Sequence, residues 1–172
     1  MKRVYKVLPI CLIVLGLVCP GCGPSSTAQL EENKALVRRV IEEVWNQGKL
    51  DVAGEIFATD YIFHAPLPGE VRGPEGLKQR VSMYRTGVPD LQLTIEDQVA
   101  EGDKVVTRWT STGTHKGKLM GIPPTGVKMT VTGIEISRIA GGKIMKKGEN
   151  WDALGMWQQL GVAPPIRKRD KK

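Results

Sequence analysis

Cysteine and histidine are scarce in this 172-residue chain, and their absence from most of it excludes several kinds of chemistry. All three cysteines lie at or before position 22, so the rest of the chain can form no disulfide and offers no thiolate nucleophile or metal ligand. The only histidines, His64 and His115, are too far apart in sequence to form a ligand pair on one helix. We therefore expect no metal site.

Signatures of nucleotide and cofactor binding are also missing. The chain has no glycine-rich phosphate loop, no dinucleotide fingerprint and no Gly-x-Ser-x-Gly elbow for a nucleophilic serine. Aromatic residues make up only 5% of the chain, whereas 20 glycines and 11 prolines indicate many turns between short elements. These features predict a globular domain of short strands, loops and a few helices, without a nucleotide-binding motif.

The body of the chain lacks an excess of charge of either sign, although the whole sequence carries a formal charge of +7. The excess comes from Lys2, Arg3 and Lys6 and from residues 167–172, and the residues between these ends carry no net charge. A basic chain end is more typical of a solvated terminus than of a polyanion site. We therefore expect no nucleic-acid partner.

A hydrophobic run long enough to span a membrane is absent, but the apolar residues 7–18 follow a basic start. This pattern is typical of a secretory signal, and it ends in CPGC at residues 19–22, which resembles a bacterial lipobox. We expect residues 1–22 to direct export across the inner membrane, with Cys22 carrying a lipid at the cell envelope. The membrane would then be contacted only through this lipid anchor. Cleavage to a soluble secreted form is the alternative.

Three ranges follow the signal: a flexible tether at residues 23–30, a folded domain at 31–162 and a basic tail at 163–172. Within the domain, apolar residues three and four apart predict helices, and a period of two predicts strands. The expected helices lie at 31–48, 51–58, 74–86 and 152–160, and the expected strands at 60–64, 90–100, 105–115, 127–139 and 143–151.

Helices come first and four long antiparallel strands follow, which favours an α+β fold with the helices on one face of the sheet. Within residues 127–139 the apolar positions change parity, from Met129 and Val131 to Ile134 and Ile136. This change predicts a β-bulge near residues 132–133. A sheet bent in this way over three N-terminal helices encloses a conical cavity, which is the default place for a ligand.

Seven short segments, taken in order, resemble the SnoaL-like polyketide cyclase (ester cyclase) family of the nuclear-transport-factor-2-like superfamily. The resemblance covers most of the domain, and it implies a conical fold and cofactor-free ring closure of a polyketide ester by an intramolecular aldol reaction. The segments are EEVWNQGKLD at 42–51, DYIFH at 60–64, GTHKG at 113–117, MGIPPTG at 120–126, GKI at 142–144, ENWD at 149–152 and QLG at 159–161.

The resemblance also implies a catalytic carboxyl group on the last strand, and counting back from residues 159–161 places it at Glu149. A carboxyl group in an apolar cavity can remove a proton from carbon and return it to an oxyanion. A solvated carboxylate that pairs with Lys146 or Lys147 is the alternative reading of Glu149. The family's cyclases surround this acid with histidine, whereas this chain has Lys147 and Glu135 there.

Further residues are candidates for the site. We expect His115 and Glu135 to assist Glu149 as catalytic groups, and two carboxylates in one cavity would make one of them hold a proton. His115 as a rim residue and His64 as a wall residue with satisfied hydrogen bonds are the alternatives. The residues expected to bind the substrate are His64, Trp151, Phe63 and Tyr61.

Two functions are consistent with these features. One is a cyclase of the SnoaL-like type that performs acid/base chemistry on a small apolar carbonyl compound. The other is a non-catalytic lipoprotein that binds a small lipophilic ligand at the cell envelope, which the predicted export favours because a polyketide assembly line lies in the cytosol. An open sheet face of threonine and valine side chains favours a homodimer.

Overall fold

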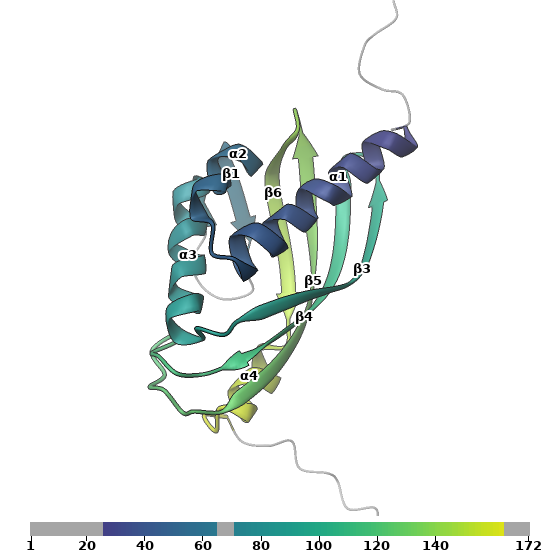
Figure 1. Cartoon of the computed structure of the whole chain (residues 1–172). Coiled ribbons are helices and arrows are strands. Elements are labelled where there is room, and N and C mark those ends of the chain that lie inside the picture. The colour runs from purple at the N-terminus through teal and green to yellow at the C-terminus, as the bar shows by residue number, and fades with distance from the viewer. Residues whose placement is uncertain (1–25, 65–70, 164–172) are drawn as a thin grey trace, which may run out of the picture.

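The computed structural model describes residues 26–64 and 71–163, which form helices packed against one curved sheet (Figure 1). The predicted signal with Cys22, and the basic tail beyond residue 163, lie outside the described residues. The helices are α1 (Thr27–Arg39), the π-helix η1 (Val40–Asn46), the 3₁₀ turn η2 (Leu50–Val52), α2 (Ala53–Ile56), α3 (Gly73–Gly87) and α4 (Ala153–Gln159). The strands are β1 (Phe57–His64), β2 (Val71–Arg72), β3 (Gln92–Glu101), β4 (Lys104–Thr114), β5 (Lys128–Ala140) and β6 (Lys143–Trp151).

Six strands form one open sheet in the order β2-β1-β6-β5-β4-β3. Neighbouring strands are antiparallel except β1 and β6, which run parallel. The sheet is strongly curved, and α1 crosses one face of it (Figure 1). Helix α3 lies along β1, and α4 lies near the N-terminal end of β5. This arrangement confirms the predicted α+β fold, a bent sheet wrapped over N-terminal helices.

Strand β5 alternates strictly between inward and outward residues, so the bulge predicted near residues 132–133 is wrong. Ile134 and Ile136 lie on the outer face with 46% and 50% of their surface exposed, whereas Glu135 between them is buried. The register shift of β5 against β6 lies further along, between Arg138 and Ile139. The apolar pattern misleads here because the inner face of the strand carries a buried carboxyl group and the outer face carries isoleucine.

Two helix boundaries also differ from the prediction. Helix α1 starts at Thr27, where the Ser26 side chain accepts a hydrogen bond from a backbone N–H, so residues 27–30 are helical and not part of a tether. The helix expected at 51–58 is short, because the chain becomes extended at Phe57 and continues as β1. Helices α3 and α4 form where the sequence predicts them.

The π-helix η1 fixes the position of Trp45 and of the edge strand β3. The Asn46 side chain accepts a hydrogen bond from the Leu93 N–H (2.8 Å) and donates one to the Leu93 carbonyl (2.9 Å), as a neighbouring strand would. Arg85 of α3 donates to the carbonyls of Trp45 (2.8 Å) and Asn46 (2.9 Å) at the end of η1. Trp45 is thereby held over the sheet.

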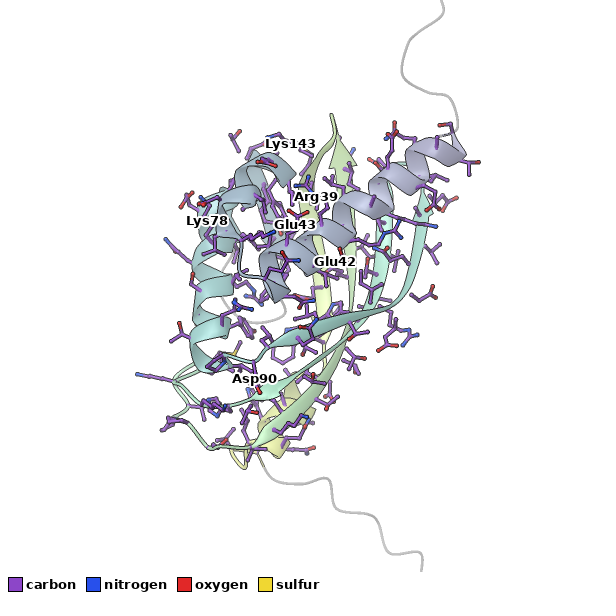
Figure 2. All side chains as sticks on the ribbon, viewed as in Figure 1. Arg39, Glu42, Glu43, Lys78, Asp90 and Lys143 are labelled. Carbon is purple, nitrogen blue, oxygen red and sulfur yellow. The ribbon has the colours of Figure 1, made fainter. Side chains whose placement is uncertain are left out.

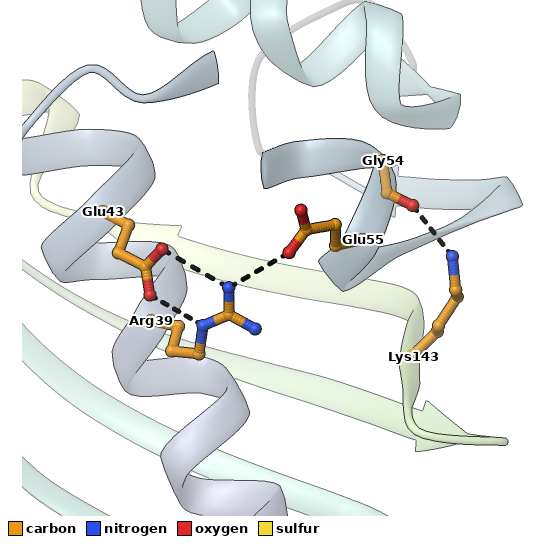
Figure 3. Close-up of polar contacts among 5 residues, drawn as sticks. All are labelled: Arg39, Glu43, Gly54, Glu55 and Lys143. Carbon is orange, nitrogen blue, oxygen red and sulfur yellow. Dashed lines mark hydrogen bonds and ion pairs between the residues drawn. The ribbon is translucent and has the colours of Figure 1, made fainter. Parts of the chain in front are cut away.

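Polar contacts at the surface tie α1, α2 and β6 together at one end of the molecule. Arg39 bonds to Glu43 (2.7 Å) and Glu55 (3.4 Å), and Lys143 donates to the carbonyl of Gly54 (2.8 Å), as Figure 3 shows. Exposed ion pairs of this kind contribute little to stability, because solvent screens them and their side chains lose freedom. The main stabilisation therefore comes from burial of apolar side chains.

Side chains from the helices and the sheet fill the space between the two layers (Figure 2). Because each buried aliphatic or aromatic side chain contributes roughly 1.5–3 kcal/mol, this shared core outweighs the surface contacts. Within the part of the chain that the structure describes, no helix is long and apolar enough to cross a membrane. The core includes Val37, Val44, Phe57, Tyr61, Leu77, Val81, Val105 and Ile144.

Candidate functional site

A pocket lies between the inner face of the sheet and the helices. Its free volume is about 60 Å³, inside a wider hollow that is partly open to solvent. Its wall is mostly aromatic and apolar, and few charged groups reach it, as is typical of sites for small molecules. Trp45, Tyr84, Trp109, Met129, Trp151 and Met156 form much of the wall, and Arg80, Lys147 and Glu149 are its charged members.

The strand register explains why charged side chains meet in this pocket. Glu135 on β5 and Glu149 on β6 lie directly opposite one another in the sheet. Lys147 lies two residues before Glu149, so its side chain points to the same face. Phe63 on β1 lies beside Lys147 in the parallel pair, which brings β1 into the site. Two strands, β5 and β6, therefore place one lysine and two glutamates side by side, and β1 adds Phe63 next to them.

Within this cluster, Lys147 is bound more closely to one carboxylate than to the other. Its Nζ makes a close ion pair with Glu135 and lies 3.9 Å from Oε1 of Glu149. Glu135 and Lys147 are buried, whereas the Glu149 side chain is 10% exposed and lines the pocket. Among the described residues, no hydrogen bond reaches the Glu149 carboxylate. Its oxygens are therefore available to a ligand.

The three groups influence one another's protonation. Burial raises the pKa of Glu135; the charge of Lys147 opposes this rise and that of Glu149 adds to it. For Lys147, burial alone would lower the pKa, but the charges of Glu135 and Glu149 outweigh burial and the pKa is raised. The cluster therefore keeps its lysine charged, while the pKa of Glu135 lies above its ordinary value.

Trp151 and Phe63, two of the residues expected to bind the substrate, lie at this cluster. Trp151 lines the pocket, and its indole N–H is buried without a hydrogen-bond partner. The Phe63 ring is buried against two cations, with Arg80 Cζ 4.7 Å and Lys147 Nζ 5.2 Å from its centroid. Phe63 thus supports the charged wall of the pocket.

Tyr61 lies on the same inner face of β1 as Phe63 and is fully buried. Its hydroxyl has no hydrogen-bond partner among the described residues. Burial raises the pKa of Tyr61 well above its ordinary value, and the charges of Glu135 and Glu149 add to the rise. The phenol therefore stays protonated beside the carboxylate cluster and is a hydrogen-bond donor.

Neither histidine is among the residues that line the pocket, and the same is true of Phe63 and Tyr61. His64 is exposed at the end of β1, on the face opposite to Phe63. His115 is fully buried, and its Nδ1 accepts a hydrogen bond from the Thr125 N–H (3.3 Å) and lies 3.1 Å from the Thr125 hydroxyl. His115 therefore holds the loop between β4 and β5 in place. This is a structural role, as in the alternative reading of His115, although the side chain is buried and not at a rim.

Sequence reasoning misses Arg80, Trp45 and Tyr84 as pocket residues. Trp45 and Tyr84 pack edge to face, 5.7 Å between ring centroids. Arg80 lies one turn before Tyr84 and three residues after the buried Leu77, on the inner side of α3. A charged residue on an apolar helix stripe is the signal that could have found it.

The arrangement is suited to proton transfer. A carboxylate faces a largely apolar space, and beside it lies a lysine that is ion-paired with a second carboxyl group. A carboxyl group in such surroundings is a candidate for general acid/base catalysis. Among the described residues, no group of three or more His, Cys, Asp or Glu side chains is placed to hold a metal ion.

Comparison with known protein families and curated sequences points to one group. The family model described as SnoaL-like polyketide cyclase matches residues 35–160. The aklanonic acid methyl ester cyclase DnrD of Streptomyces peucetius is 33% identical over 133 residues, which span 76% of this chain and 91% of that relative. The nogalonic acid methyl ester cyclase of Streptomyces nogalater is 29% identical over 119 residues, 68% of this chain and 89% of that relative.

Solved structures resemble the same domain. TsrD of Streptomyces laurentii has 31% sequence identity and a TM-score of 0.70, covering 77% of this chain and 97% of that chain. A protein of Jannaschia sp. CCS1 has 26% identity and a TM-score of 0.74, covering 83% of this chain and 100% of that chain. The likeness therefore extends over the whole folded domain.

Proposed function

This chain belongs to the SnoaL-like polyketide cyclase family, and we propose that it closes a ring in a small, largely apolar carbonyl compound by acid/base catalysis without a cofactor. The observation that carries this proposal is the Glu149 carboxylate, which faces an apolar pocket beside a lysine already paired with Glu135. Relatives named as methyl ester cyclases support a methyl ester as the substrate.

In the proposed reaction, an oxygen of Glu149 removes a proton from a carbon next to a carbonyl group of the substrate. The resulting carbanion attacks a second carbonyl carbon of the same molecule, and a carbon–carbon bond forms while the carbonyl π electrons move to oxygen. This alkoxide takes the proton back from Glu149. The product is therefore an isomer of the substrate, and the enzyme returns to its starting state.

Lys147 and Glu135 have separate roles in this proposal. The ammonium group of Lys147 lines the pocket and stabilises the negative charge that develops on the enolate oxygen. Glu135 does not line the pocket but holds Lys147 through the close ion pair, and it is a positioning residue. Tyr61 does not line the pocket, and its buried hydroxyl stays protonated on the inner face of β1.

A second candidate function is binding without catalysis. The predicted export signal favours a lipoprotein that holds a small lipophilic compound at the cell envelope, and the aromatic pocket wall is suited to such a ligand. In that case Glu149 contributes polarity to the pocket but performs no chemistry.

A turnover assay with a matched variant tests the cyclase proposal. We expect the protein to convert aklanonic acid methyl ester into a cyclised isomer of unchanged mass. Chromatography separates the isomer from the substrate, and mass spectrometry checks that the mass is the same. Glu149→Gln is expected to lower kcat about 100-fold or more, because acid/base groups contribute roughly 10²–10⁴-fold. Glu101→Gln, at the exposed end of β3, is the control and leaves kcat unchanged.

Solvent exchange distinguishes a weak cyclase from a binder. In deuterated water, the wild-type protein should exchange the acidic carbon-bound proton of the ester, and Glu149→Gln should not. Tight binding of the ester with neither exchange nor cyclisation would support the binding function instead. Full turnover by Glu149→Gln would remove Glu149 as the base.

A further inference from the structure

Arg80 is a cation in the pocket wall that has no charged partner among the described residues. Its guanidinium lies between two aromatic rings, with Cζ 4.7 Å from the Phe63 centroid and 5.4 Å from the Tyr84 centroid. Its Nε is buried and has no hydrogen-bond partner. Within residues 26–64 and 71–163 the guanidinium forms no ion pair, since the cluster carboxylates Glu135 and Glu149 face Lys147.

An arrangement of this kind is costly unless a ligand completes it. A buried N–H donor without a partner costs free energy, and more when the group is charged. The two rings orient the plane of the guanidinium and stabilise its charge, but they satisfy none of its N–H groups. An oxygen atom bound in the pocket would satisfy them. The unused donor therefore points to a ligand that carries an acceptor.

Two further donors in the pocket wall are also unused. The indole N–H groups of Trp109 and Trp151 are buried and unpartnered, and both side chains line the same pocket as Arg80. Together with Arg80 they offer N–H donors on a wall whose other members, apart from Ser111, Lys147 and Glu149, are apolar or aromatic. A ligand suited to this wall has a ring-shaped apolar body and an oxygen that carries negative charge.

We propose that Arg80 selects the ligand of this pocket by binding an ionised oxygen, a carboxylate or phenolate, on an otherwise apolar ring compound. The guanidinium suits this role because its planar N–H fork matches a carboxylate and cannot lose its charge. This inference rests on the proposed function in that the same pocket binds the substrate. It assigns Arg80 to ligand recognition and leaves the proton transfer to Glu149.

Two probes of equal shape test the inference by calorimetric titration. 1-Naphthoate carries a carboxylate, and 1-naphthamide carries a neutral amide on the same ring system. We expect the wild-type protein to bind 1-naphthoate at least tenfold more tightly than 1-naphthamide. In Arg80→Gln the preference should fall below twofold, with the affinity for 1-naphthamide nearly unchanged. Arg80→Met keeps the stem packed between the rings and serves as a second variant with the same expected result.

The control is Arg108→Gln, which removes an equal charge from the exposed outer side of β4. This variant should keep the tenfold preference, because Arg108 does not reach the pocket. Equal affinities of the wild-type protein for the two probes would overturn the inference. So would an unchanged preference in both Arg80 variants, or an equal loss of preference in Arg108→Gln.

Glu149→Gln separates this inference from the proposed function. The variant should keep the preference for 1-naphthoate, because it removes a carboxylate and leaves Arg80 in place. If the preference depends on Arg80 but no substrate is cyclised, the recognition role stands and the cyclase proposal fails. If esters are cyclised but the probes bind equally well, the cyclase proposal stands and the role of Arg80 is refuted.

Discussion

Lys147 is buried between two carboxylates, and its removal should be costly. Lys147→Met leaves Glu135 and Glu149 without their cation, so at least one buried carboxyl group must take up a proton or become solvated. Breaking a buried ion pair on one side typically costs about 3–5 kcal/mol. We expect a loss of this size in the free energy of unfolding, measured by urea denaturation at pH 7.

A paired variant serves as the control for this prediction. Glu135→Leu combined with Lys147→Met removes both partners of the close ion pair, and apolar replacements of a buried pair are often nearly neutral. The double variant should therefore recover most of the stability that Lys147→Met loses. A single variant within about 0.5 kcal/mol of wild type, the usual range for surface substitutions, would show that the cluster is solvated.

For the candidate residues on β1, strand alternation alone predicts which face of the sheet each side chain occupies. Tyr61 and Phe63 are two apart on one strand and therefore share a face, and both are buried. His64 follows Phe63 directly, so the same rule places it on the opposite face, where it is exposed. The position of His115 could not be derived, because it depends on a loop that returns at Thr125 to bond the imidazole.

At the scale of single elements, Gly133 on β5 makes room for an aromatic wall residue. A Cβ at this position would overlap the six-membered ring of Trp109, which lies against the glycine. Gly133→Ala must therefore displace Trp109 from the pocket wall, and overpacking of this kind typically costs about 1–3 kcal/mol. We expect that loss in thermal or urea denaturation, together with weaker binding of 1-naphthamide.

Gly148 on β6 provides the matched glycine for comparison. A Cβ there would meet no atom within 4 Å, and the residue lies opposite Ile136 on the outer face. Gly148→Ala should leave stability unchanged or raise it slightly, because alanine is less costly than glycine in a strand. If the two substitutions lowered stability equally, the loss would come from the change of a strand glycine to alanine and not from contact with Trp109.

Elements whose residues follow one pattern were predictable, and those that carry the site were not. Helix α3 begins with proline at its first turn and ends at Gly87, and both signals lie in the local sequence. In contrast, the π-helix η1 is held by Arg85 and by strand β3, which are distant in sequence. Strand β5 misleads because Glu135 is buried and Ile134 is exposed. This is the reverse of the usual distribution, in which apolar side chains are buried and charged ones face water.

At the scale of the whole molecule, the outer face of the sheet carries an apolar stripe. Val99, Val106 and Ile136 lie opposite one another on three successive strands, and Ile134 lies beside them. Val99 is 60% exposed, and both isoleucines are about half exposed. A stripe of this kind across neighbouring strands is more typical of a covered surface than of one facing water.

The export signal and the lipid on Cys22 stay predictions, since they lie outside the described residues.

We propose that two copies of the chain pack through this stripe as a homodimer. A two-fold axis lets the same patch serve on both copies, so the apolar side chains of one stripe cover those of the other. Ile136→Lys should shift the folded domain from dimer to monomer in sedimentation equilibrium, with little change in its unfolding curve because Ile136 is half exposed. Leu154→Lys replaces an equally exposed apolar residue on α4 and should remain dimeric. A wild-type domain that sediments as a monomer at micromolar concentration would refute the proposal, because the stripe would then face water unpaired.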